Sequence, residues 1–129
     1  MQNECYFLYK IIGNSKNFKS FLKMGDRFLI DRGDLSKDVR LENIPIIQRN
    51  LFKIRNKRKN KKIFVATNLL ESMLENNYPT RGEANDIYNS LEIGADGLVL
   101  AAETAIGKHP QDTVLFLERM IKVFKKEKH

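Results

Sequence analysis

Four short apolar runs punctuate the chain, and a polar or charged residue follows each of them. The runs are rich in aromatic and aliphatic side chains, and polar stretches or turn-forming residues bound them. Runs of this length and composition are typical of buried β-strands. The pattern therefore predicts strands at residues 5–11, 27–30, 63–66 and 98–100.

Helical periodicity fills the segments between these runs. It predicts helices over residues 16–23, 44–54 and 80–92, a shorter helical turn near 69–73, and a last helix from about residue 110. The helix at 80 opens with the sequence TRGE, in which Thr80 and Glu83 can form a capping box. Residues 35–43 are interpreted as a polar connection.

The helical spacing also indicates which side chains are buried. The first helix is expected to bury Phe18, Phe21 and Leu22. For the longest central helix the predicted buried face comprises Ile44, Ile47, Leu51 and Ile54. The helix at 80–92 is expected to bury Ala84, Ile87, Tyr88 and Leu91, and the last helix to present one face made of Val114, Leu117, Ile121 and Phe124.

Strand and helix alternate four times, which predicts a parallel sheet with right-handed crossovers. The expected fold class is α/β, with four consecutive βα units that correspond to half of a (β/α)8 TIM barrel. We interpret residues 1–129 as one domain. Because the outer strands of such a sheet keep unpaired backbone groups, we expect a second copy, a complementing chain or a further part of the same protein to cover them.

Positive charge is concentrated in one place. The chain has a net charge of +7, and residues 53–62, KIRNKRKNKK, hold seven positive side chains in ten. A solvated helix end explains such a run, since cations suit the C-terminus of a helix. A phosphate or nucleic-acid surface is the alternative. No aromatic residue interleaves the run, so the first interpretation is favoured and nucleic acid is the weaker one.

The expected compartment is the cytoplasm. The apolar runs are far shorter than the ~18 residues that a membrane span needs, and the first residues, MQNECYFLYK, do not resemble a signal peptide. The single cysteine, Cys5, excludes an internal disulfide and fits a reducing compartment.

Candidate functional residues lie where the predicted strands end. Lys10, Asp34, Thr67 and Glu103 each follow or close an apolar run. In a parallel sheet the carboxyl ends of the strands meet at one rim, and ligands bind there. The sequence therefore predicts that an ammonium, a carboxylate and a hydroxyl, those of Lys10, Asp34 and Thr67, converge at this rim.

The stretches around these residues resemble the pyruvate kinases. The similar segments are LIDRGDLS, FVATNLLESM and PTRGEANDIYNSLEIGADGLVLAAETAIGKHP, which appear in the family's order. The resemblance covers about residues 7–114 and corresponds to the later half of the family's catalytic barrel domain.

The resemblance implies phosphoryl transfer between phosphoenolpyruvate and ADP, with Mg2+ as the divalent cation and K+ as a possible second ion. It implies that Lys10 neutralises charge on the substrate and that Asp34 binds the metal. The N–H groups of Gly33 and Asp34, together with the Thr67 hydroxyl, would hold the substrate carboxylate. Glu103 would lie near the proton-transfer end of the site.

Several positions depart from the family's pattern. Ile12 stands where the family has a glutamate that binds the metal, Asp31 where it has an alanine, and Ala101 where it has a serine. The arginine that clamps the phosphoryl group and the potassium-binding residues have no counterpart in the matched stretches. We therefore expect a weakened magnesium site and no turnover by the chain alone. The alternative function is a non-catalytic relative that binds a metabolite or assembles with a partner.

Overall fold

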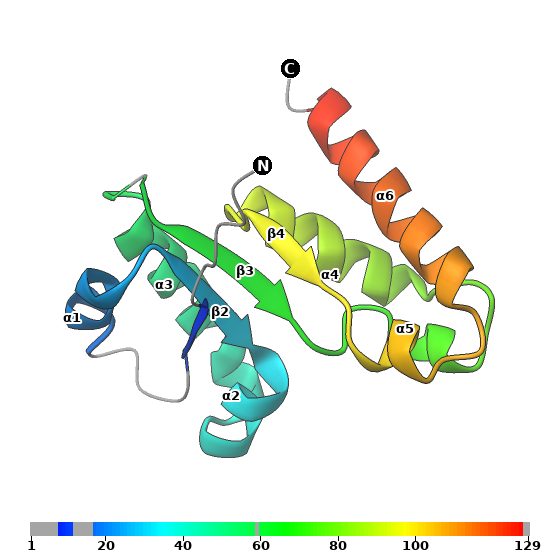
Figure 1. Cartoon of the computed structure of the whole chain (residues 1–129), viewed down its shortest axis with the longest axis horizontal. Coiled ribbons are helices and arrows are strands. Elements are labelled where there is room, and N and C mark those ends of the chain that lie inside the picture. Colours follow the sequence, from blue (N-terminus) through cyan, green and yellow to red (C-terminus); the bar gives the residue numbers. More distant parts are fainter. Residues whose placement is uncertain (1–7, 12–16, 59, 128–129) are drawn as a thin grey trace, which may run out of the picture.

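The computed structural model describes residues 8–11, 17–58 and 60–127 of the chain, and Figure 1 shows their arrangement. The described strands are β1 (Leu8–Ile11), β2 (Arg27–Asp31), β3 (Lys62–Ala66) and β4 (Gly97–Val99). The helices are α1 (Phe18–Phe21), η2 (Leu22–Met24), α2 (Arg32–Asp38), η3 (Leu41–Asn43), α3 (Ile44–Arg55), η4 (Glu71–Leu74), α4 (Arg81–Glu92), α5 (Ala102–Ala105) and α6 (Pro110–Glu127).

The four strands form one sheet in the order β1-β2-β3-β4, and every neighbouring pair is parallel. Consecutive strands are therefore joined by crossover connections that contain helices, as in part of an α/β barrel. The prediction of an α/β fold with parallel strands is confirmed. Strand ends differ from the predicted ones by about one residue, and the predicted start of the first strand, at residues 5–7, lies outside the described residues.

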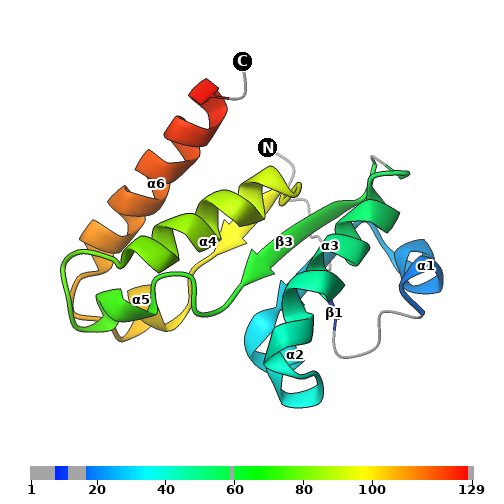
Figure 2. The ribbon, with the colours of Figure 1, turned by 180° about the vertical axis from the view of Figure 1, so that it is seen from behind.

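The helices lie mainly on one face of the sheet. In Figure 1 α3 and α4 run behind the strands, and in Figure 2, from the opposite side, they run in front of them. The α6 helix packs against α4 on the side away from the sheet. By alternation along the strands, the half-buried side chains of Leu29 and Phe64 lie on the face opposite the fully buried Phe28 and Ile63.

Alternation along β2 explains where the core lies. Phe28 and Ile30 are fully buried under the helices, while Arg27, Leu29 and Asp31 are half-buried on the other face. The first helical segment closes this part of the core, because Phe18 and Leu22 are buried and the Phe18 ring meets Phe28 edge-on at 6.0 Å.

The segment after β2 is helical, so the prediction of a polar connection there is wrong. α2 begins at Arg32, directly after the strand, and η3 follows it. Asp31 caps the helix, since its carboxylate accepts the Asp34 N–H at 3.2 Å. Leu35 is buried and anchors α2 to the core. One buried residue in a seven-residue helix gives too weak a periodicity to detect in the sequence.

The buried face of α3 is rotated from the predicted one. Ile44 and Leu51 are buried as expected, but Ile47 and Ile54 are only half-buried. The rest of the buried face consists of Gln48, Phe52 and Arg55. Two polar side chains therefore occupy positions that hydrophobic periodicity assigns to solvent.

Gln48 is a buried polar residue on the inner face of α3. Its side chain is 5% exposed, and its Oε1 atom is buried without a hydrogen-bond partner. An unsatisfied buried acceptor costs about 1–3 kcal/mol. We expect Gln48→Met, which keeps the volume, to raise the free energy of unfolding by about 1 kcal/mol.

Urea unfolding measures this change. Gln111→Met, at an exposed position of α6, is the matched control and should stay within about 0.5 kcal/mol of the parent chain. A lower stability for Gln48→Met would show that the buried amide is satisfied in solution.

The predicted capping box at the start of α4 is confirmed. The Thr80 hydroxyl accepts the Glu83 N–H at 3.1 Å, and the Glu83 carboxylate accepts the Thr80 N–H at 2.9 Å. The same carboxylate accepts the Ser72 N–H at 2.8 Å and the Ser72 hydroxyl. Glu83 thus ties the segment after β3 to the start of α4.

These hydrogen bonds predict a pH-dependent stability. Burial alone would raise the pKa of Glu83, but the bonds from Ser72 and Thr80 outweigh it and hold the pKa below 4.5. A carboxylate whose pKa is lower in the folded than in the unfolded state stabilises the fold at pH values above its unfolded pKa. This stabilisation is lost as the pH falls through the folded pKa. We expect Glu83→Gln to cost about 1 kcal/mol at neutral pH and the difference to shrink below pH 4.5. Thermal unfolding of both chains between pH 7 and pH 3 tests this; a constant difference would contradict it.

Other predicted buried positions agree in part. In α4, Ile87 and Leu91 are buried, whereas Ala84 and Tyr88 are half-buried. In α6, Leu117 is buried, Ile121 and Phe124 are half-buried, and the prediction for Val114 is wrong, because its side chain is 41% exposed. Thr113, which donates its hydroxyl to the His109 carbonyl at 2.7 Å, is buried instead.

Candidate active site at the carboxyl ends of the strands

The carboxyl ends of β2 and β3 meet in one hydrogen-bonded cluster. The Gly33 N–H donates to Oγ1 of Thr67 at 2.7 Å, across 34 residues of sequence. Oγ1 of Thr67 also lies 3.2 Å from Oδ1 of Asp31 and 2.6 Å from the Ala66 carbonyl oxygen. The structure thus brings together three of the predicted residues, Gly33, Asp34 and Thr67, with Asp31 beside them.

Both backbone N–H groups that the resemblance assigns to a substrate carboxylate have internal partners. Gly33 donates to Thr67, and Asp34 donates to the Asp31 carboxylate. The chain's own Asp31 carboxylate therefore already accepts a hydrogen bond at this turn. Gly33 suits the position because a Cβ atom there would lie 3.3 Å from Oδ1 of Asp31 and 3.6 Å from Oγ1 of Thr67.

The turn after β3 is strained. Thr67 has a φ of 73° and Asn68 a φ of 56°, both in the left-handed region. A β-branched residue seldom adopts this region, and such residues cluster at functional sites. Each strained residue costs about 1–3 kcal/mol, so neighbouring contacts must hold the turn.

Arg32 supplies those contacts. Its guanidinium donates to the Thr67 carbonyl oxygen at 2.8 and 3.2 Å and to Oδ1 of Asp86 at 2.6 Å. One side chain therefore links the start of α2, the strained turn and α4. Arg32 is not among the site residues predicted from the sequence, although its place between a strand end and Gly33 is a usable signal.

β1 brings Lys10 beside this cluster. Its backbone is in register with Leu29, two residues before Asp31. The Lys10 side chain and Ile12 lie outside the described residues, so the predicted role of the ammonium and the effect of Ile12 on the metal stay predictions.

Asp34 is the candidate metal ligand. Its side chain is 26% exposed, and Lys37 lies 3.4 Å from Oδ1. Within the described residues, no three His, Cys, Asp or Glu side chains gather as a metal site. Mg2+ is commonly held by one or two carboxylates and substrate phosphates. Asp34 fits the first of these requirements, whereas the Asp31 carboxylate already caps α2.

Glu103 lies apart from the exposed cluster. Its side chain is 3% exposed, and its two oxygens accept the Leu70 N–H at 3.1 Å and the Ala101 N–H at 3.2 Å. It thus joins the loop after β3 to the segment after β4. These contacts favour a positioning role, and its catalytic role stays a prediction.

Parallel βα units whose polar groups gather at the carboxyl ends of the strands are typical of the α/β-barrel class of proteins. The family model for the barrel domain of pyruvate kinase matches residues 9–114. The chain therefore belongs to the pyruvate kinase family.

Known relatives agree with this assignment. The chain is 40% identical over 112 residues to a pyruvate kinase of Thermotoga maritima, covering 87% of this chain and 24% of that protein. It is 42% identical over 108 residues to a pyruvate kinase of Methanocaldococcus jannaschii, covering 84% and 24%. The crystal structure of pyruvate kinase from Pyrobaculum aerophilum superimposes with a TM-score of 0.84 at 36% identity, over 89% of this chain and 28% of that one.

The chain thus spans about a quarter of the length of the curated relatives it matches. The family model matches residues 9–114 and does not test the predicted domain limits, residues 1–129, which stay a prediction. No helix within the described ranges combines the length and the apolar character needed to cross a membrane.

Proposed function

We propose that the chain binds phosphoenolpyruvate or a similar phosphorylated carboxylate together with Mg2+, at the carboxyl ends of β1, β2 and β3. The grouping of Gly33, Thr67 and Asp34 at one rim of the sheet carries this proposal. Thr67 would orient the substrate carboxylate, and the Gly33 and Asp34 N–H groups would do so once they exchange their internal acceptors for it. Lys10 would neutralise the charge of the substrate, and Asp34 would hold the metal. K+ follows from family resemblance alone, and the cytoplasm is the proposed compartment.

The chemistry belongs to the phosphoryl-transfer class, but we propose that this polypeptide alone does not turn over substrate. Phosphoryl transfer relies on positioning and on charge stabilisation around the transferred group. Asp34 offers one carboxylate to the metal, and the Asp31 carboxylate is held by Thr67 and the α2 backbone. A binding role without catalysis fits this arrangement.

Calorimetry with phosphoenolpyruvate, with and without Mg2+, tests the binding. We expect saturable binding that strengthens with Mg2+, and an Asp34→Asn variant that loses the effect of the metal. Asp38→Asn, an exposed position of the same helix, is the matched control. Equal behaviour of the two variants would overturn the site. Pyruvate formation from phosphoenolpyruvate and ADP by the purified chain would overturn the proposed inactivity.

Asp31 provides a sharper prediction about this site. Its carboxylate holds the Asp34 N–H and repels an incoming anion. Asp31→Ala should raise the affinity for phosphoenolpyruvate about tenfold. The free energy of one charge-assisted hydrogen bond, gained by the substrate from the freed Asp34 N–H, corresponds to about that change in affinity. Calorimetry measures the change, with Asp38→Ala as the control. An unchanged or lower affinity would show that the Asp31 carboxylate supports binding.

We also propose that the chain assembles with a second copy or with a complementing chain. Within the described sheet, β1 and β4 each pair on one side only. Two such sheets joined edge to edge supply the eight strands of a closed barrel. Size-exclusion chromatography with light scattering should give a mass above the 15.0 kDa of one chain. A monodisperse monomer at micromolar concentration would contradict the assembly.

A further inference from the structure

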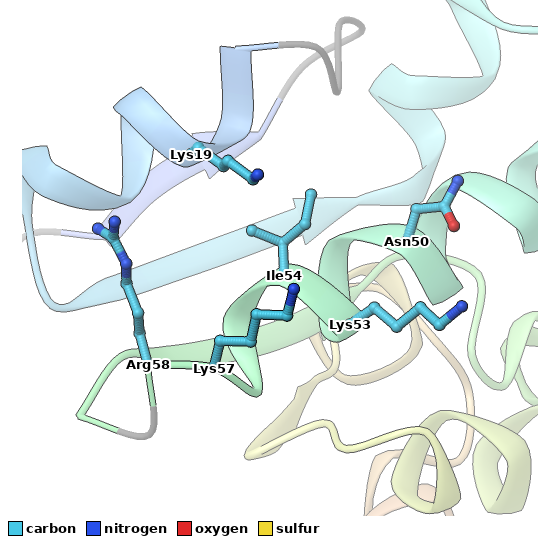
Figure 3. Close-up of a pocket in the computed structure, with 6 residues that line it drawn as sticks. All are labelled: Lys19, Asn50, Lys53, Ile54, Lys57 and Arg58. Carbon is cyan, nitrogen blue, oxygen red and sulfur yellow. The ribbon is translucent and has the colours of Figure 1, made fainter.

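We propose that a basic hollow between α1 and α3 binds a compact anion carrying two or more phosphate groups. The hollow has a volume of about 770 Å³. Four of its six lining residues are cationic; the full lining is Lys19, Asn50, Lys53, Ile54, Lys57 and Arg58. Figure 3 shows Lys57 and Arg58 extending toward α1 from the turn after α3, with Lys19 on α1 and Ile54 between them.

The four cations come from two separate segments. Three belong to the basic run at residues 53–62, and Lys19 comes from α1, more than thirty residues earlier. Lysine and arginine at the end of α3 suit its helix dipole. That effect does not explain Lys19, whose side chain faces the same hollow from another helix.

Two other cations of the basic run have structural partners. In the same run, Arg55 pairs with Asp96, and Lys61 lies 3.3 Å from Asp26. Among the described residues, none of the four cations of the basic hollow forms an ion pair. Arg55 and Lys61 therefore stabilise the fold, whereas Lys57 and Arg58 line the basic hollow with Lys19, and the Lys53 side chain lies at its edge and points away from these three. Clustered like charges raise the local positive potential and attract anions.

The lining indicates what kind of anion fits. A volume of this size is within the range of small-ligand sites, and an anion with several phosphate groups offers more contacts to the four cations than a single phosphate does. Lysine is a common binder of phosphate as a point charge, and arginine can bind it with two hydrogen bonds. None of the lining residues is aromatic, so the hollow offers no surface on which a nucleobase stacks. Phosphate groups, and not bases, are what it can recognise.

The basic hollow is separate from the candidate active site. Lys57 and Arg58 precede the amino end of β3, whereas Thr67 follows its carboxyl end. A ligand in the hollow therefore lies at the other end of the strand from the Asp34 cluster, and this inference does not depend on the proposed function.

Calorimetry with inorganic tripolyphosphate and with orthophosphate, at constant ionic strength, tests the proposal. We expect tripolyphosphate to bind with one saturable site, more tightly than orthophosphate. The double variant Lys19→Gln/Lys57→Gln should weaken tripolyphosphate binding about tenfold, as expected for two lost contacts to charged groups. The control Lys122→Gln/Lys126→Gln removes the same charge from exposed positions of α6 and should change the affinity less than about twofold.

Other outcomes would overturn the proposal. Equal weakening by the two double variants would mean that net charge alone attracts the anion. Equal affinity for orthophosphate and tripolyphosphate would exclude recognition of several phosphates. Single-stranded RNA that binds more tightly with increasing length, and competes with tripolyphosphate, would make the region a nucleic-acid surface instead. Circular dichroism checks that each variant folds, and Arg58→Gln replaces the double variant if it does not.

Discussion

Arg55→Ala should lower the free energy of unfolding by about 3–5 kcal/mol, the range for removing one partner of a buried ion pair. The Arg55 side chain is 8% exposed, and it pairs with Asp96, whose side chain is 24% exposed. Its guanidinium also donates to the carbonyl oxygens of Gly94 at 2.6 Å and Lys61 at 3.3 Å. The truncation leaves these acceptors without their donor.

The position of Asp96 makes this loss larger. Asp96 accepts the Ile63 N–H at 2.8 Å, so the pair connects α3 to the starts of β3 and β4. Without Arg55 a partly buried carboxylate remains with one backbone donor, and desolvated charge without a counterion is costly. Domains of this size have about 5–15 kcal/mol of stability. The variant should therefore lose a large share of its stability.

Urea unfolding followed by circular dichroism measures the change. Arg58→Ala is the matched control, because Arg58 is an exposed arginine three positions later and should cost less than about 0.5 kcal/mol. Similar losses for both variants would show that general charge, and not the pair with Asp96, stabilises this end of the sheet.

Arg55 also shows where sequence patterns stop predicting the fold. The strands were predictable because each is a local apolar run, and the α4 capping box because both partners lie within four residues. From the sequence, Arg55 is interpreted as one of the solvated cations of the basic run. Its burial depends on Asp96, 41 residues away, which no local periodicity reveals.

The candidate site divides in the same way. Parallel topology is enough to predict that strand ends converge, so Gly33, Asp34 and Thr67 could be grouped from the sequence. The contact between Arg32 and Asp86 spans 54 residues. The hydrogen bond from the Asp34 N–H to the Asp31 carboxylate depends on the backbone geometry at the start of α2. The contact between Arg32 and Asp86 has no signature in composition or spacing, whereas the Asp31 cap has the ordinary N-cap spacing but was hidden because α2 itself was not predicted.

Glu103→Gln should lower the free energy of unfolding by about 2–3 kcal/mol, because the amide replaces one acceptor with a donor. Each Glu103 oxygen accepts a different backbone N–H, from Leu70 and from Ala101. A glutamine can satisfy one of them and must direct its own NH2 group at the other. The site is buried, so water does not replace the lost bond.

Amide hydrogen exchange separates this structural role from a catalytic one. If Glu103 holds the two loops together, the amides of Leu70 and Ala101 should exchange faster in Glu103→Gln, whether or not substrate is present. Glu118→Gln, at an exposed position of α6, should leave both rates and the stability unchanged. Unchanged stability and exchange in Glu103→Gln would mean that the carboxylate is not needed to join the loops. A chemical role would then be the better explanation of a buried glutamate behind the Thr67 turn, since burying a carboxylate costs free energy that packing alone does not return.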